Sequence, residues 1–153
     1  MVEFKQAETA AQLTTVRGLF TEYANWLNYR TCFEGFEKEL DGLPGEYGPP
    51  EGCLLLALYE DKPAGCVALR KVKNGVCEMK RLWVRDKFRG KNIGWNLAEE
   101  IIARARKMGY KMMVLETIPM MERAISIYQI LGFKQTAVNK IGNDQVIRME
   151  LQL

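Results

Sequence analysis

The sequence has no histidine among its 153 residues. This absence excludes a Ser-His-Asp triad, a histidine-ligated metal site and acid–base catalysis by an imidazole. Any proton transfer in this protein must therefore use carboxylates, tyrosine, lysine, thiols, water or backbone groups.

The four cysteines, Cys32, Cys53, Cys66 and Cys77, include no CxxC pair, and this spacing disfavours a zinc site or a redox-active dithiol. The last three lie in apolar, strand-like runs, where a thiol usually serves as a small buried hydrophobic group. We therefore expect reduced, buried thiols and no bound metal.

Long apolar runs are also lacking. None approaches the roughly 18 residues that span a bilayer, and the N-terminal residues contain no apolar core of a signal peptide. We therefore expect a cytoplasmic protein without a membrane partner. Hydrophobic residues make up 48% and charged residues 27%, an ordinary globular composition, and the length favours a single domain over residues 1–153.

The modest net charge of +3 conceals two local imbalances. Residues 80–91 contain six basic side chains and one acidic side chain, Asp86, which gives a local net charge of +5. Residues 34–46 contain five acidic side chains and one basic side chain, Lys38. The first segment therefore predicts an anionic ligand, and the second favours a cationic one.

Apolar spacing predicts four helices. A capping box at Thr9 and Gln12 begins a helix over residues 9–28, and a short helix is expected over 33–40. A third helix covers residues 93–108, and Pro119 opens a fourth that ends at Gly132. The predicted strands are residues 2–7, 53–59, 64–69, 76–84, 111–117, 133–138 and 145–151.

The connections between these elements predict how the strands pair. Short turns at 61–63 and 73–75 make the second, third and fourth strands an antiparallel meander. The strand–helix–strand unit over 76–117 is a crossover, which makes its two strands parallel. The expected architecture is therefore a mixed sheet covered by helices.

The segment from Val84 to Trp95 joins a strand to the start of a helix. Free backbone N–H groups and the helix dipole make such a start an anion site, and Arg89 and Lys91 add positive charge. Neither a Walker A loop nor a GxGxxG motif occurs in the sequence. The segment therefore predicts a polyphosphate site of another kind; the alternative is a solvated basic loop before an ordinary helix.

Two blocks resemble the GNAT superfamily of acyl-CoA-dependent N-acyltransferases. Residues 89–94, RGKNIG, look like its (R/Q)xxGx(G/A) signature, and residues 124–133, AISIYQILGF, are similar to its AxxLYxxxGF helix. The resemblance covers nearly the whole chain. Asn92 replaces the first glycine of the signature and tolerates positive φ, and Met121 stands where the family often has asparagine.

This resemblance implies an α/β (α+β) fold in one N-acetyltransferase domain. Its sheet is mixed and mostly antiparallel, with about seven strands, about four flanking helices and two splayed parallel strands at the centre. Acetyl-CoA is the implied cosubstrate, with its phosphates on residues 80–91 and its pantetheine arm along the fourth strand. The implied binding residues are Leu82, Trp83, Val84, Arg89, Gly90, Lys91, Asn92, Ile93, Gly94 and Trp95.

In the implied reaction, an amine attacks the acetyl carbonyl carbon while a backbone N–H stabilises the oxyanion. An alkylamine has a pKa of about 10, so a base or a water chain must remove its proton. Glu78 and Glu116 are candidate bases, and strand alternation places Glu78 on one face with Leu82 and Val84. Glu116 could instead bind the ammonium group, and either glutamate could be an ordinary surface or ion-paired carboxylate.

Tyr128 is the candidate acid for the departing CoA thiolate; the alternative is a core aromatic residue. Tyr29, Phe33, Tyr47 and Trp83 are candidates for the acceptor pocket or for the core. The acidic segment and Glu116 favour a small cationic amine as acceptor.

Three other functions are compatible with the sequence: acetylation of a protein N-terminus or lysine, CoA sensing without turnover, and nucleic-acid binding. The basic charge is confined to one loop, which disfavours nucleic acid as a partner. A homodimer is compatible with the sequence.

Overall fold

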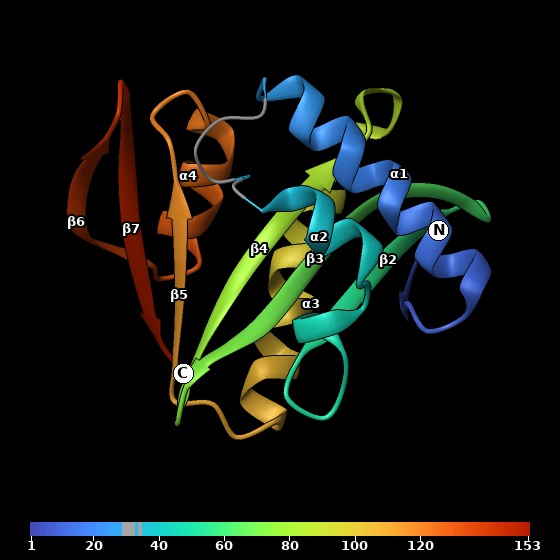
Figure 1. Cartoon of the computed structure of the whole chain (residues 1–153), viewed down its shortest axis with the longest axis horizontal. Helices are drawn as coiled ribbons and strands as arrows, with labels where there is room; N and C mark the ends of the chain where they lie inside the picture. Colours follow the sequence, from blue (N-terminus) through green and yellow to red (C-terminus); the bar gives the residue numbers. More distant parts are fainter. Residues whose placement is uncertain (29–32, 34) are drawn as a thin grey trace.

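The computed structural model describes residues 1–28, 33 and 35–153 of the chain. Its strands form one sheet in the order β1-β2-β3-β4-β5-β7-β6, with helices on both faces (Figure 1). The strands are β1 (Val2–Gln6), β2 (Cys53–Tyr59), β3 (Lys62–Lys73), β4 (Val76–Val84), β5 (Met112–Thr117), β6 (Lys134–Ile141) and β7 (Asp144–Gln152). The helices are α1 (Ala10–Trp26), α2 (Phe36–Asp41), α3 (Ile93–Lys107) and α4 (Glu122–Ile130).

The first helix begins where the capping box predicts. Thr9 accepts a hydrogen bond from the Gln12 amide at 3.1 Å, and the Gln12 side chain accepts one from the Thr9 amide at 3.1 Å. Both bonds satisfy amide groups that the start of a helix otherwise leaves without partners. The apolar spacing of this segment buries Val16, Leu19 and Phe20 against the sheet.

Two hydrophobic cores lie on opposite faces of the sheet. The front face, nearest the viewer in Figure 1, carries α1 and α2, and its core includes Phe20, Phe36 and Trp83. The rear face carries α3 and α4, and its core includes Leu97 and Tyr128. Strands between them are apolar on both sides, which explains the unbroken hydrophobic run of β2.

The predicted meander and crossover are confirmed. β2, β3 and β4 pair antiparallel, whereas β4 and β5 pair parallel. The parallel ladder is short: it joins Val76–Glu78 to Met112–Val114. Beyond it β4 and β5 diverge, leaving a gap in the middle of the sheet (Figure 1).

A β-bulge interrupts β4 beside this gap. Cys66 pairs with Trp83 and Ala68 pairs with Lys80, so two residues, Arg81 and Leu82, stand opposite one residue of β3. Arg81 takes a φ of 61°, in the left-handed region that residues other than glycine rarely occupy. The extra residue reverses the alternation of side chains along the rest of the strand.

The bulge makes one sequence prediction wrong. Glu78 lies on the front face, where its register partner is Arg70, whereas Leu82 and Val84 pack against the rear core. Simple alternation placed all three on one face, but the bulge shifts the residues that follow it by one position.

The start of α4 also differs from the sequence prediction. Pro119 does not open the helix; it lies in a turn in which the Met121 amide donates to the Ile118 carbonyl at 3.0 Å. Proline suits the second position of such a turn because its φ is already fixed near −65°. The helix itself begins three residues later, at Glu122.

Over the described ranges, no helix is long and apolar enough to cross a membrane. The same ranges contain no cluster of three acidic or cysteine side chains that could hold a metal ion. Cys53, Cys66 and Cys77 are buried and unpaired, and burial raises the pKa of each thiol. Cys32 lies outside the described residues.

Candidate active site

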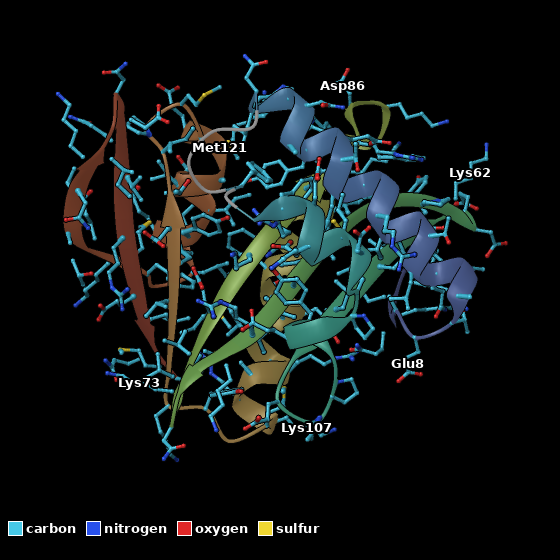
Figure 2. The ribbon with its side chains drawn as sticks, viewed as in Figure 1. Glu8, Lys62, Lys73, Asp86, Lys107 and Met121 are labelled. Carbon is cyan, nitrogen blue, oxygen red and sulfur yellow. The ribbon has the colours of Figure 1, made fainter. Side chains whose placement is uncertain are left out.

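The loop between β4 and α3 approaches the helix through two left-handed residues. Gly90 has a φ of 84° and Asn92 a φ of 61°, so the asparagine adopts the conformation expected of it in place of glycine. The loop is exposed, and the labelled Asp86 at its tip points into solvent (Figure 2). The two residues turn the chain sharply into α3.

The first turn of α3 has no side-chain cap. Asn92 occupies the N-cap position without a side-chain hydrogen bond to the helix, and the Asn96 amide makes the first helical bond, to Asn92 at 3.0 Å. The amides of Ile93, Gly94 and Trp95 therefore have no intrahelical acceptor. Together with the positive end of the helix dipole, such amides suit an anion, and we call this first turn the candidate anion site.

The basic cluster over residues 80–91 divides into two groups, which corrects the expectation that all of it faces phosphates. Arg81 is buried on the front face, where it binds Glu39 of α2 through two bonds of 2.8 Å. Its guanidinium also lies 4.4 Å from the centroid of the Phe33 ring. This arginine joins α2 to the bulge of β4 and cannot reach the loop.

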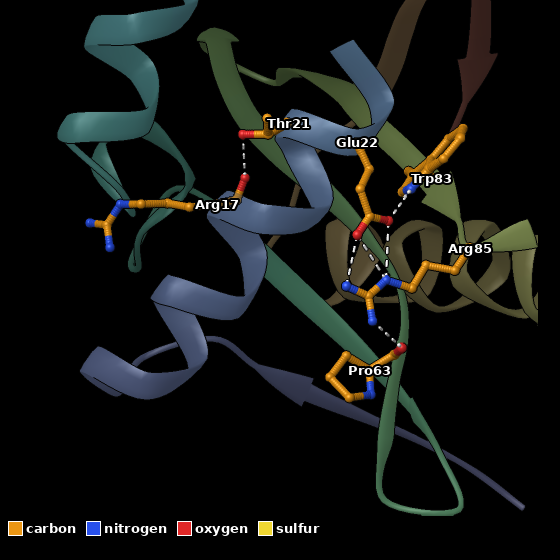
Figure 3. Close-up of polar contacts among 6 residues, drawn as sticks. All are labelled: Arg17, Thr21, Glu22, Pro63, Trp83 and Arg85. Carbon is orange, nitrogen blue, oxygen red and sulfur yellow. Dashed lines mark hydrogen bonds and ion pairs between the residues drawn. The ribbon is translucent and has the colours of Figure 1, made fainter. Parts of the chain in front are cut away.

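Arg85 has a structural role as well (Figure 3). Glu22 of α1 accepts bonds from Arg85 Nη2 at 2.7 Å, from Arg85 Nε at 3.1 Å and from Trp83 Nε1 at 3.3 Å. Arg85 also donates to the Pro63 carbonyl at 3.3 Å. Burial alone would raise the pKa of Glu22, but the bonds from Arg85 and Trp83 outweigh it and hold that pKa below its usual value.

Positive charge near the anion site is therefore left to Lys87, Arg89 and Lys91, all of which are exposed. Arg89 lies 5.1 Å from the Trp83 ring centroid and 5.8 Å from that of Trp26, and its Nε donates to the Val84 carbonyl at 3.3 Å. This packing holds the guanidinium next to the end of β4, within the loop that precedes α3.

The end of β4 presents backbone rather than side chains to the gap. The indole of Trp83 is buried in the front core, and Leu82 and Val84 pack against the rear core. Over the described residues, β5 does not pair with this part of β4, so no strand occupies that edge; the Val84 carbonyl there accepts the bond from Arg89. Met121, where the family often has asparagine, lies at the start of α4 and packs against the front core (Figure 2).

Tyr128 lies in α4 with its ring in the rear core, 5.7 Å from the Phe133 ring between centroids. Burial raises the pKa of its hydroxyl, and the charge interaction with Tyr23 of α1 raises it further. Within the described residues, the Tyr128 hydroxyl has no hydrogen-bond partner.

The two candidate bases occupy different surroundings on the front face. Glu78 is buried and accepts a bond of 2.8 Å from Arg70, which also lies 3.7 Å from Glu46. Glu116 is exposed on β5, two residues beyond the last pair of the parallel ladder. Glu78 therefore forms an ion pair with an arginine, whereas Glu116 has no ion-pair partner among the described residues.

The acidic segment is less acidic as a surface than its composition suggests. Glu39 is paired with Arg81 at 2.8 Å, which neutralises its charge, whereas Glu46 is exposed and lies 3.7 Å from Arg70, whose closer partner is Glu78. Phe33 and Tyr47 are buried in the front core, and burial raises the pKa of the Tyr47 hydroxyl. Tyr29 and Glu34 lie outside the described residues.

Sequence reasoning missed the arginines on the front face, Arg70 and Arg148. Each stands opposite a candidate base in the strand ladders: Arg70 opposite Glu78, and Arg148 opposite Glu116. Only the strand register reveals these two pairings. The sequence does not show this register, because a bulge interrupts β4 and because β5 pairs with β7, which is not the next strand in the chain.

Comparison with known proteins gives consistent results. A family model described as the acetyltransferase (GNAT) family matches residues 18–133. An uncharacterized N-acetyltransferase of Schizosaccharomyces pombe is 38% identical over 138 residues, or 87% of this chain and 85% of the relative. An acetyltransferase structure from Streptococcus agalactiae is 21% identical, with a TM-score of 0.82 over 99% of this chain and 98% of that one. A GNAT family acetyltransferase from Elizabethkingia anophelis with acetyl-CoA bound is 25% identical, with a TM-score of 0.62 over 67% of this chain and 77% of that one.

Proposed function

Because the chain belongs to the acetyltransferase (GNAT) family, we propose that it transfers the acetyl group of acetyl-CoA to the primary amine of a small molecule. The observation that carries this proposal is the gap between β4 and β5, which opens beside the uncapped start of α3. An uncapped helix start suits a pyrophosphate, and an unpaired strand edge suits an extended arm with amide groups.

In this arrangement the phosphates of acetyl-CoA lie against the amides of Ile93, Gly94 and Trp95. Gly90 and Asn92 shape the approach of the loop, and Arg89 and Lys91 supply charge. The pantetheine arm follows the open edge of β4 along residues 82–84. Acetyl-CoA bound to the Elizabethkingia relative supports this choice of cosubstrate.

Attack takes place in a ternary complex without an acetylated enzyme. The amine nitrogen forms a bond to the acetyl carbon, and a backbone N–H of residues 82–84 stabilises the resulting oxyanion. Collapse of the tetrahedral intermediate breaks the C–S bond. The thiolate takes a proton from Tyr128, and the nitrogen gives its proton to a carboxylate or to water.

A thiol-release assay with acetyl-CoA and a panel of amines tests this function directly. We expect release of CoA that depends on the amine and yields one N-acetyl product per thiol. Thiol release that occurs only with peptides or protein lysines would instead indicate a protein acetyltransferase. CoA binding without release from any acceptor would indicate a sensor.

The anion site gives a binding prediction. Gly94→Asp and Arg89→Glu should each weaken CoA binding by about 1.5–3 kcal/mol, because each places negative charge where a phosphate is expected. Gly94→Asp should not harm the fold, since an added Cβ lies 3.6 Å from the nearest atom, Val84 Cγ2, and an acidic residue suits a first helical turn. Isothermal calorimetry with CoA measures the effect.

Arg106→Glu is the matched control for these variants, since Arg106 is exposed near the other end of the same helix. It should bind CoA as the wild type does at physiological salt. Unchanged affinity in both loop variants would place the phosphates elsewhere.

The two candidate bases give a kinetic prediction. Glu116→Gln should lower kcat/KM most at low pH, where few acceptor amines are neutral, if Glu116 removes the proton. It should mainly raise the acceptor KM if the carboxylate only binds the ammonium group. Glu78→Gln leaves Arg70 without its closest partner, so its thermal stability must be measured beside its pH–rate profile. A normal profile in both variants would assign deprotonation to water.

A further inference from the structure

Two opposite charges stand side by side on the front face. Glu116 of β5 and Arg148 of β7 are direct partners in the antiparallel ladder. Leu115 and Met149, their neighbours along the two strands, belong to the rear core, so Glu116 and Arg148 both point to the front. Side chains paired in this way have Cβ atoms about 4.5–5.5 Å apart.

Glu116 and Arg148 do not form an ion pair with each other. Arg148 Nε donates to Glu150 Oε2 at 3.0 Å, two residues along the same strand, and not to Glu116. In the part of the chain that the structure describes, the two terminal nitrogens of Arg148 make no hydrogen bond, and the Glu116 carboxylate has no ion-pair partner. The Arg148 side chain is 39% exposed. Glu116 can thus bind a positive group of a ligand, and the terminal nitrogens of Arg148 beside it can bind a negative group. We call these two side chains the open pair.

Neighbouring charges on the same face are arranged differently. Arg70 binds Glu78 at 2.8 Å and Arg81 binds Glu39 at 2.8 Å, so these four side chains neutralise each other within the protein. Arg148 also makes an internal ion pair, with Glu150, but it does so through Nε alone, and Glu116 takes no part in it.

The open pair also lies beside the place of reaction. Glu116 follows Val114, the last β5 residue in the parallel ladder, by two positions, which is about 7 Å along a strand. It therefore borders the gap on the side opposite α3. An acceptor that approaches from the front meets this pair before it reaches the acetyl group.

We propose that the acceptor carries a carboxylate next to its amine, as an α-amino acid does. This inference rests on the proposed acetyl transfer. Glu116 receives the ammonium group, and Arg148 binds the carboxylate through its two terminal nitrogens, which match the two oxygens of a carboxylate in geometry. An amine without a carboxylate would place its positive charge beside Arg148 and supply no acceptor for the two terminal nitrogens of that arginine.

The test compares alanine with ethylamine, the same amine without its carboxylate. We expect the wild type to favour alanine, and Arg148→Met to lower the ratio of kcat/KM for alanine to that for ethylamine about 10–100-fold. The loss should fall mainly on the KM for alanine. Arg148→Lys keeps the charge without the planar fork and should give an intermediate ratio.

Arg106→Met is the matched control and should leave the ratio unchanged. Circular dichroism and thermal unfolding verify that each variant is folded; if Arg148→Met is not, Arg148→Gln takes its place. A ratio that Arg148→Met does not alter, or a wild type that favours ethylamine, would overturn the inference while leaving acetyl transfer intact. If no amine releases CoA, the proposed function itself fails, and the inference fails with it.

Discussion

Tyr128→Phe is expected to lower kcat about 10²–10⁴-fold, the usual contribution of a general acid. A phenol with its ordinary pKa of about 10 is protonated at neutral pH, so the Tyr128 hydroxyl has a proton to donate to a departing thiolate. Burial raises this pKa, which keeps the hydroxyl neutral but makes it a weaker acid. The substitution retains the ring that packs beside Phe133 and removes only the donor. CoA affinity should therefore change little, and the free energy of unfolding should fall by less than about 1 kcal/mol.

Tyr110→Phe is the control for this variant. The Tyr110 hydroxyl donates to the Glu51 carbonyl near the C-terminal end of α3, far along the helix from the anion site. Its removal should leave kcat unchanged. A Tyr128→Phe enzyme with normal turnover would reduce Tyr128 to a packing residue and assign the proton to solvent.

Arg81→Met is expected to give the largest loss of stability, about 3–5 kcal/mol, because it leaves the largely buried carboxylate of Glu39 without its arginine partner. The side chains of Arg81 and Glu39 are 3% and 18% exposed, so water replaces the lost partner poorly. Denaturant unfolding measures the free energy of unfolding. Arg106→Met, which alters an exposed side chain, should change it by less than about 0.5 kcal/mol.

The pH dependence of stability distinguishes loss of this ion pair from loss of packing. Burial alone would raise the pKa of Glu39, but its bonds to Arg81 and the charge of Arg81 outweigh burial and lower it from 4.5. A lowered pKa stabilises the folded state above about pH 4.5, and this contribution is lost as the pH falls through the folded-state pKa. The difference between wild type and Arg81→Met should therefore shrink on acidification. A difference that is constant with pH would indicate a packing defect.

Local patterns predicted most of the fold. The bounds of β2 and β4 match the predicted strands at Cys53–Tyr59 and Val76–Val84, because apolar runs between turn residues mark buried strands. The capping box placed the start of α1. These features depend on residues a few positions apart.

Features that depend on distant residues were not predicted. The bulge at Arg81 requires that a buried arginine find Glu39, and nothing near Arg81 in the sequence indicates that partner. For the same reason, two of the six basic side chains in the apparent phosphate cluster proved to be structural: Arg81 binds Glu39 of α2, and Arg85 binds Glu22 of α1. Local charge counts cannot separate ligand-binding side chains from those that join elements of the fold.

The candidate site was predicted where its parts are contiguous in sequence. The loop before α3 was identified from residues 84–95, and Asn92 has the positive φ expected of it. The open pair on the front face was not identified, because Arg148 meets Glu116 only once β7 is placed beside β5. A pair of residues from two strands that are not consecutive in the chain can be identified only when the register of those strands is known.

The gap between β4 and β5 has a consequence for folding itself. Within the described ranges, it leaves the edges of two strands, β4 and β5, without a strand partner in the interior of a sheet, where edges are normally paired. An extended molecule in the gap acts as a missing strand, so its concentration enters the folding equilibrium by mass action. At 100 times its dissociation constant, such a molecule would add about 2.7 kcal/mol to the free energy of unfolding. The amount of folded protein in a cell would then depend on the supply of the molecule that completes its sheet.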